Sequence, residues 1–135
     1  MAQFDIHGLA ARRPLSPHLS IYRPTLTMLM SIAHRITGAA LYAGTVVLVW
    51  YLLAAASGGA AFVAAASFLH SFFGQLILLG FTFAFLHHFF GGVRHLIWDL
   101  GYGFEHPMRE WLALGTIVAS LSFTVILFAA AHLLA

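Results

Sequence analysis

Two polar segments interrupt the apolar runs of this sequence, and the first combines a hydroxyl, an imidazole and a guanidinium. Ser31, His34, Arg35 and Gly38 stand at positions i, i+3, i+4 and i+7. This spacing places them on one face of a helix. Such a face can orient a carbonyl oxygen, stabilise negative charge or relay a proton, so it is a candidate functional site.

The second segment places histidines beside glycines. His88, Gly91, Gly92 and His95 share one helical face by the same spacing. Neutral imidazole is an ordinary axial ligand of haem iron, and glycines let a bulky planar ring approach the helix backbone. Alternatively, His88 hydrogen-bonds a neighbouring helix and the glycines only permit close helix packing. The residues alone leave both interpretations open.

Arg35 and His88 are expected at similar depths in a membrane. Arg35 lies nine residues after Leu26, or about 13 Å along a helix. His88 lies ten residues before Trp98, or about 15 Å. A cation at that depth costs at least about 2.5–3.5 kcal/mol unless it meets a partner. The carboxylates all lie near the surface: Asp5, Asp99, Glu105 and Glu110. The compensating anion must therefore come from a partner subunit or a cofactor, and haem propionates would fill this role.

Other histidines offer alternatives. His34 has a depth similar to that of His88 and is the alternative iron ligand, although Arg35 would then lie close to the iron. His95 lies two turns nearer the interface and suits either a propionate contact or a snorkelling side chain. His87 falls on a different face and is expected to serve packing.

The remaining histidines are expected at boundaries and surfaces. His70 and His132 fall near the outer ends of the second and third apolar runs, where a pair of histidines can hold a second haem. A histidine at a membrane boundary is more often simply solvated, and we expect that here. The others are expected at the surface: His7, His18 and His106.

The composition excludes a soluble enzyme. Of the 135 residues, 61% are hydrophobic and 7% are charged, against about 25% charged in a soluble domain. So few charges cannot coat a water-exposed surface. The chain has no cysteine, which excludes disulfides, iron–sulfur ligation and thiolate sites. It also has no basic run of the kind that a nucleic-acid partner requires.

Three apolar stretches must position the two polar faces. They cover about residues 25–56, 61–98 and 109–133 and follow a polar leader over residues 1–24. Each stretch exceeds the roughly 20 residues that span a bilayer. Because backbone groups in lipid must be satisfied internally, each stretch is expected to be a helix. The sequence therefore predicts an all-α membrane protein, a single membrane-anchor domain over residues 1–135 with three transmembrane helices.

The charge distribution predicts the orientation of these helices. Arginines precede the first helix, and charged residues cluster around the loop between the second and third. The loop between the first and second helices has no charge. By the positive-inside rule, the N-terminus and the second loop face the cytoplasm or matrix, and the C-terminus lies outside.

Three runs carry a family resemblance: RPLSPHLSIY at 13–22, SIAHRITG at 31–38 and HFFGGVRHLIWDLG at 88–101. In this order, and over nearly the whole chain, they closely resemble the cytochrome b556 anchor subunits of succinate dehydrogenase (respiratory complex II), which have three helices. One departure is the double glycine at Gly91 and Gly92, where some members keep only the second glycine. This changes packing near the haem and leaves the ligand assignment intact.

The resemblance implies a role for each matching residue. His88 matches the histidine that supplies one axial ligand to haem b, and the other ligand comes from a second anchor subunit. Ser31 and Arg35 match the ubiquinone site, where the serine hydrogen-bonds a quinone carbonyl. The positions implied to bind the haem or its propionates are His34, Arg35, His95, Gly91 and Gly92. No residue of this chain is expected to be catalytic by itself.

The resemblance also implies partners. A flavoprotein with FAD would oxidise succinate, and an iron–sulfur subunit would carry its clusters and pass electrons toward the membrane. This chain and a second hydrophobic anchor subunit would share one haem b, sit in membrane lipid and form part of the ubiquinone-reduction site, linking the tricarboxylic acid cycle to the respiratory chain. The leader is unlike a transit peptide, so we expect a bacterial inner (cytoplasmic) membrane rather than the mitochondrial inner membrane.

Two other classes of function remain compatible with the residues alone. A small transporter or channel subunit would bury Arg35 and several histidines as a proton or ion relay, and it would show no haem absorbance. A purely structural anchor would recruit peripheral proteins without any redox group. It would leave the face with Ser31 and Arg35 without a purpose.

Overall fold

The described residues of this protein form helices and connecting turns, with no strand among them. The computed structural model describes residues 17–134. Most of the predicted leader, with Asp5 and His7, lies outside this range. The elements in chain order are α2 (His18–Ile21), α3 (Leu26–Ser57), α4 (Gly59–His70), α5 (Phe72–Asp99) and α6 (Met108–Leu134). Three of them, α3, α5 and α6, are long and apolar enough to cross a membrane, which confirms the predicted all-α architecture.

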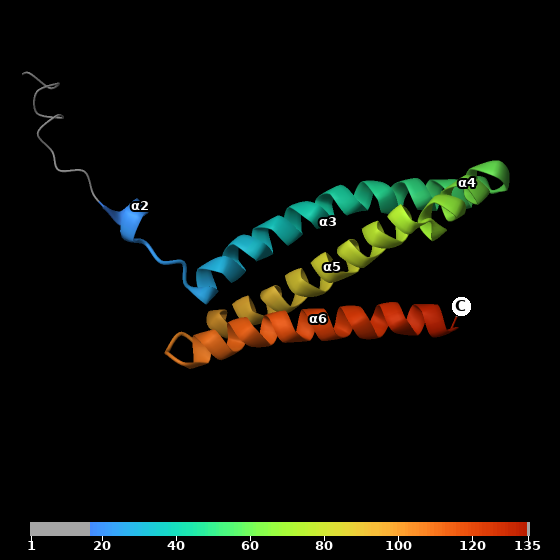
Figure 1. Cartoon of the computed structure of the whole chain (residues 1–135). Helices are drawn as coiled ribbons and strands as arrows, with labels where there is room; N and C mark the ends of the chain where they lie inside the picture. Colours follow the sequence, from blue (N-terminus) through green and yellow to red (C-terminus); the bar gives the residue numbers. More distant parts are fainter. Residues whose placement is uncertain (1–16, 135) are drawn as a thin grey trace, which may run out of the picture.

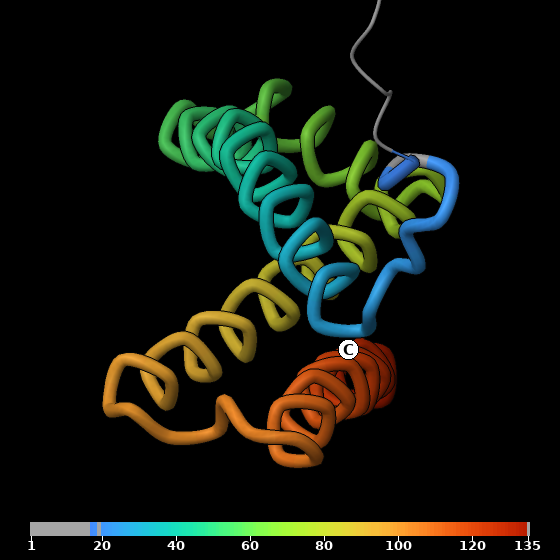
Figure 2. The backbone as a smooth tube through the Cα atoms, turned by 90° about the vertical axis from the view of Figure 1, so that its left-hand side faces the viewer, coloured from blue at the N-terminus to red at the C-terminus, as the bar shows by residue number. Residues whose placement is uncertain are grey.

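The three long helices lie side by side, with α5 in contact with both α3 and α6 (Figure 1). The helix α5 runs in the opposite direction to its two neighbours. A view turned by 90° about the vertical axis shows α3 and α6 on different sides of α5 (Figure 2). Because α5 is shared by both helix pairs, its residues can form one site with α3 and another with α6.

The helix ends follow from local hydrogen bonding and from glycine. The Thr25 side chain caps α3 by accepting a hydrogen bond from the Met28 amide at 3.4 Å. At the other end, Gly58 and Gly59 take φ values of +66° and +55°. Such left-handed conformations favour glycine. They allow the chain to turn from α3 directly into α4.

The second apolar stretch differs from its prediction as one helix over about residues 61–98, because it is divided at Ser71. Ser71 is extended, with a ψ of 161°, and its hydroxyl accepts a hydrogen bond from the Gly74 amide at 3.2 Å. A Cβ at Gly74 would overlap the carbonyl oxygen of Phe68. The close approach of the first turn of α5 to the end of α4 therefore requires glycine. The short helix α4 packs on α3 and α5, and α5 is the part of this stretch that is long enough to cross a membrane.

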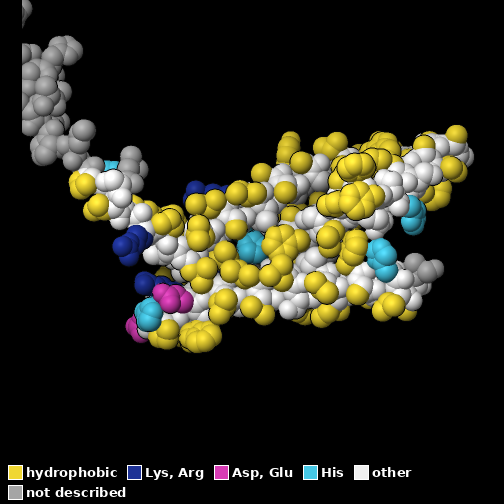
Figure 3. Space-filling model, viewed as in Figure 1, with side chains coloured by type: hydrophobic (Ala, Val, Ile, Leu, Met, Phe, Trp, Pro, Cys, Tyr) yellow, Lys and Arg dark blue, Asp and Glu magenta, His cyan; other side chains and the backbone are white. Residues whose placement is uncertain are grey.

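Small and hydroxyl-bearing side chains fill the contacts between helices. The buried apolar residues include Ala54, Ala65, Ala84 and Ala113, whereas many large apolar side chains are exposed. This distribution is typical of membrane helices, which associate through small residues and polar contacts while larger side chains face lipid or partner subunits. On the face in Figure 3, charged side chains gather toward the end that holds the start of α3 and the α5–α6 loop. The predicted orientation in the membrane stays a prediction.

Candidate functional site

The centre of the candidate site is a pair of stacked imidazoles, one from α3 and one from α5. The rings of His34 and His88 have centroids 3.8 Å apart and planes inclined by 9°. Glycines opposite each ring make room for them. A Cβ at Gly38 would lie 2.9 Å from Cε1 of His88, and a Cβ at Gly91 would overlap Nδ1 of His34. The pair therefore depends on a glycine in each of the two helices.

Hydrogen bonding assigns the protons of His88. Its Nδ1 lies 3.0 Å from the backbone carbonyl oxygen of His34 and 3.5 Å from the hydroxyl oxygen of Thr37. The Thr37 hydroxyl itself donates to the Ala33 carbonyl at 2.9 Å. Since a carbonyl oxygen only accepts, Nδ1 carries the proton, and Nε2 keeps its lone pair. An imidazole oriented in this way is the form that ligates a metal.

His34 has an unsatisfied nitrogen in the same place. Its Nδ1 is buried and has no hydrogen-bond partner within the described part of the chain. A buried polar atom without a partner is uncommon in folded proteins. The nitrogen faces the backbone of α5 at Gly91, where an added Cβ would overlap it.

A third histidine joins the pair on the side of the α5–α6 loop. The ring of His95 lies 5.2 Å from that of His34, centroid to centroid, and packs edge-on against Trp98 at 5.3 Å. The indole N–H of Trp98 donates to the carbonyl of Gly103 at 3.2 Å. This bond ties the histidine cluster, His34, His88 and His95, to the loop after α5. The imidazole of His95 is exposed and free to contact a ligand.

No hydrogen bond or ring contact joins Ser31 or Arg35 to this cluster within residues 17–134. Ser31 is half-buried and Arg35 is exposed on α3, within the first ten residues of that helix. A Cβ added at Gly92 would meet no atom within 4 Å. Among residues 17–134 the ion pair found, between His106 and Glu110 at 3.3 Å, lies at the start of α6. In the part of the chain that the structure describes, no carboxylate forms an ion pair with Arg35.

His87 belongs to the other side of α5. It is 3% exposed, and its Nδ1 lies 3.2 Å from Oγ of Ser120 on α6. The Ser120 hydroxyl donates to the Ile117 carbonyl at 2.9 Å, so Nδ1 of His87 donates to the serine oxygen. This contact fits the packing role expected for His87.

Ser120→Ala is expected to weaken the α5–α6 contact. It removes the acceptor of a buried imidazole N–H, and a buried polar group left without a partner costs about 1–3 kcal/mol. The measurement is the thermal unfolding midpoint of the detergent-solubilised protein with its partners. The exposed serine two residues on provides the control Ser122→Ala. Equal midpoints for the two variants would contradict a stabilising His87–Ser120 bond.

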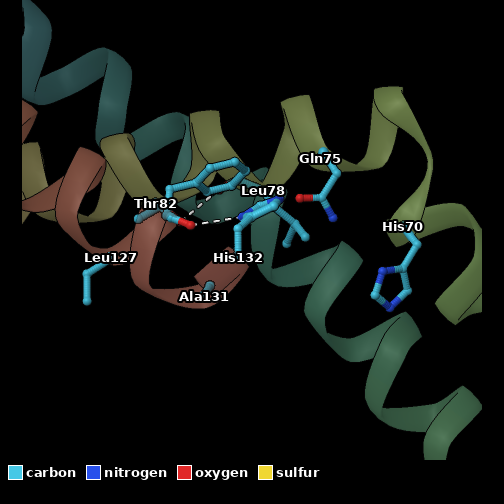
Figure 4. Close-up of a pocket in the computed structure, with 8 residues that line it drawn as sticks. His70, Gln75, Leu78, Thr82, Leu127, Ala131 and His132 are labelled. Carbon is cyan, nitrogen blue, oxygen red and sulfur yellow. Dashed lines mark hydrogen bonds between the residues drawn. The ribbon is translucent and has the colours of Figure 1, made fainter. Parts of the chain in front are cut away.

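The two boundary histidines border a separate cavity at the opposite end of the bundle. His70 and His132, both exposed, line a cavity of about 440 Å³ together with Gln75 and Thr82. Figure 4 shows the two imidazoles on different helices and not directed toward one another. Nδ1 of His132 lies 2.9 Å from the Phe128 carbonyl oxygen. That hydrogen bond lies within α6 and does not involve His70.

Arg94 was not among the predicted site residues, yet it is buried near the end of α5. The side chain is 2% exposed, and its Nε and Nη1 have no hydrogen-bond partner among residues 17–134. The spacing between His87 and Arg94 in the sequence could have indicated that Arg94 is buried. Arg94 lies seven residues after His87, so both share the face of α5 that packs on α6.

Comparisons with known proteins agree with this arrangement. The sequence model of a family described as "Succinate dehydrogenase/Fumarate reductase transmembrane subunit" matches residues 10–129. The succinate dehydrogenase cytochrome b556 subunit of Paracoccus denitrificans is 41% identical over 120 residues, covering 86% of this chain and 92% of that protein. The corresponding subunit of Rickettsia prowazekii is 33% identical over 117 residues, covering 87% and 91%.

A mitochondrial protein is similar as well. The succinate dehydrogenase cytochrome b560 subunit of Sus scrofa is 39% identical over 112 residues, which cover 79% of this chain and 64% of that protein. Relatives from bacteria and from mitochondria thus share the sequence pattern of this multi-pass inner-membrane protein. The extent of the family match and the three apolar helices lead to one conclusion. This chain belongs to the family of succinate dehydrogenase/fumarate reductase transmembrane subunits, as a cytochrome b subunit.

Proposed function

We propose that this chain anchors a succinate:ubiquinone oxidoreductase in the inner membrane, holds one haem b together with a second anchor subunit, and forms part of the ubiquinone-reduction site. The observation that carries the proposal is the hydrogen bond from Nδ1 of His88 to the His34 carbonyl at 3.0 Å. It leaves Nε2 as a free ligand atom on a helix that presents a histidine cluster.

The residues of the cluster fit a haem. His88 offers a neutral nitrogen donor, which is the usual protein ligand of a b-type haem iron. His34 stacks on His88, and His95 is exposed beside it. Both imidazoles can donate hydrogen bonds to propionate oxygens. Gly92 faces open space, so a flat ring meets no side chain there.

The two adjacent glycines of α5 have different surroundings. Gly91 gives room to the His34 imidazole, whereas the space beside Gly92 is open. In the proposal, Gly91 positions a propionate-binding histidine and Gly92 lets the macrocycle approach α5. His88 would ligate the iron, and haem supplies a one-electron redox centre when bound.

The quinone site is proposed on α3 beside His34. Ser31 lies about one turn before this histidine, and Arg35 directly follows it. Ser31 would donate a hydrogen bond to a ubiquinone carbonyl, and Arg35 would stabilise the negative charge that develops on the quinone oxygens as electrons arrive. Arg35 is exposed in this chain. It is therefore available to a propionate or a quinone at the contact with a partner subunit.

The other parts of the reaction are proposed to lie on partner subunits. A flavoprotein with FAD would oxidise succinate, and an iron–sulfur subunit would deliver electrons to the quinone. The second axial ligand of the haem would come from the second hydrophobic anchor subunit. The exposed apolar surface of α3 and α5 suits contact with that subunit or with lipid. We place the complex in a bacterial inner membrane, with the N-terminus on the cytoplasmic side.

Two adjacent glycines provide a matched experiment on the haem site. Gly91→Ala puts a methyl group against Nδ1 of His34, whereas Gly92→Ala adds the same group in open space. Overpacking of this kind costs about 1–3 kcal/mol. We therefore expect Gly91→Ala to bind haem roughly tenfold more weakly, and Gly92→Ala to retain it.

The measurement is the haem content per flavin of the purified complex, from its reduced-minus-oxidised spectrum. The reverse order, with haem lost in Gly92→Ala and kept in Gly91→Ala, would contradict the proposed roles of the two glycines. An unchanged haem content in both variants would show that the His34 imidazole has no part in the haem site.

A further inference from the structure

The guanidinium of Arg94 is enclosed between α5 and α6, and the proposed function makes no use of it. The residue is 2% exposed, and neither Nε nor Nη1 has a hydrogen-bond partner among the described residues. The guanidinium lies over Trp98, with Cζ 5.1 Å from the ring centroid. A ring face does not accept hydrogen bonds as an anion does. Because an unpaired buried charge is costly, Arg94 requires a ligand.

Arg94 lines a cavity of about 170 Å³ between these two helices. The rest of the wall is mainly apolar and includes Phe90, Ile97 and Trp111. The Thr116 hydroxyl, also in the wall, already donates to a carbonyl of its own helix at 2.9 Å. One cation in an apolar wall suits a ligand with a compact anionic group and an apolar remainder.

The acidic residues nearby do not supply this anion. Asp99 and Glu105 are exposed, and no ion pair to Arg94 is present within residues 17–134. Glu110 pairs with His106 at 3.3 Å instead. The partner of the guanidinium must therefore come from outside the described chain.

The depth of the cavity in the membrane indicates where the anionic partner of Arg94 comes from. Arg94 lies five residues before Asp99, where α5 ends, or about 7–8 Å along the helix axis. Trp111 is near the start of α6, and tryptophan favours the membrane–water interface. The cavity therefore lies where lipid headgroups join their acyl chains.

The cavity also opens away from the histidine cluster. Phe90, Val93, Arg94 and Ile97 stand at i, i+3, i+4 and i+7, a face of α5 roughly opposite to that of His88. In the proposed function, the second anchor subunit covers the His88 side. The opposite side is then left to lipid.

We propose that Arg94 and the cavity around it bind the phosphodiester headgroup of a membrane phospholipid, with an acyl chain along the apolar wall. A guanidinium donates parallel charge-assisted hydrogen bonds to phosphate oxygens, which a lysine ammonium cannot reproduce in the same geometry. The bound lipid would fill the groove between α5 and α6 and neutralise the buried charge.

The test uses the intact complex, stripped of lipid in detergent and titrated with micelles that contain dioleoyl phosphatidylglycerol. Native mass spectrometry counts the lipids retained by each form. We expect Arg94→Gln to retain one phospholipid fewer than the wild type, with an affinity at least about tenfold weaker, because charge-assisted hydrogen bonds are lost. Arg109→Gln removes an exposed arginine at the same end and is expected to match the wild type.

If the Arg94→Gln complex fails to assemble, a second pair of variants tests lipid binding in the same cavity. Gly115 lines the cavity and has open space where a side chain would go, so Gly115→Leu blocks the cavity and keeps the guanidinium. Gly80→Leu adds the same side chain at an open position outside this cavity. We expect the first to lose one lipid and the second to keep it.

Equal lipid retention in the wild type, Arg94→Gln and Gly115→Leu would overturn the proposal. Displacement of the lipid by millimolar inorganic phosphate would also overturn it, since the site would then take a free anion. The haem spectrum of each variant is recorded in parallel. It separates loss of this lipid from loss of the proposed haem site on the other side of α5.

Discussion

The His88→Ala complex is expected to lose the spectrum of a low-spin haem b. In the proposed site, Nε2 of His88 is the ligand that this chain gives to the iron. Its orientation is set by the hydrogen bond from Nδ1 to the His34 carbonyl. Alanine supplies no ligand, so six-coordinate iron with two histidines cannot form. The expected effect is complete loss of the low-spin signal in optical and paramagnetic resonance spectra.

The other histidines provide matched controls. His132→Ala removes an exposed imidazole at the far end of the bundle and is expected to leave the spectrum unchanged. His34→Ala tests the alternative ligand and is expected to weaken haem binding while the remaining haem stays low-spin. A low-spin spectrum that survives in His88→Ala and disappears in His34→Ala would reverse the ligand assignment.

Ser31→Ala is expected to slow ubiquinone reduction by about tenfold while the haem spectrum is retained. The hydroxyl is proposed to donate one hydrogen bond to a quinone carbonyl, and such a bond is worth about 1–1.5 kcal/mol, or roughly a factor of ten in rate. Arg35→Gln is expected to have a larger effect, because it removes a charge that stabilises the reduced oxygen. The measurement is steady-state succinate:quinone reductase activity.

The control for Ser31 lies on the same helix. The Ser57 hydroxyl donates to the Leu53 carbonyl at 2.8 Å, at the opposite end of α3, and Ser57→Ala should leave the rate unchanged. Succinate oxidation with an artificial acceptor that bypasses the membrane should be normal in every variant. If Ser31→Ala also slowed that bypass reaction, or left quinone reduction at the wild-type rate, Ser31 would have no part in the quinone site.

Hydropathy was sufficient to predict three membrane helices, because each apolar run is long enough to span a bilayer. It was insufficient to place the break at Ser71. The runs that flank His70 and Ser71 are both apolar, and the break depends on the Ser71 cap and on the close approach of Gly74 to the Phe68 carbonyl. That approach is a contact between two helices, which a hydropathy profile does not contain.

Helical spacing predicted which residues share a face, and it placed His88 with His95 and His34 with Ser31. It could not predict that His34 and His88 stack at 3.8 Å, because this distance depends on how closely α3 and α5 pack. Arg94 shows a different shortcoming. It was not singled out from the sequence, although its register with His87 places it inside the α5–α6 contact.

The proposed role of this chain is to hold a haem b in the membrane. The most direct measurement is the reduced-minus-oxidised visible spectrum of the wild-type complex in detergent, with flavin determined in the same sample. We expect the α band of a low-spin b-type haem, with one haem per flavin. A complex that contains flavin and lacks any haem band would contradict it. The buried histidines and arginine would then favour an ion or proton relay.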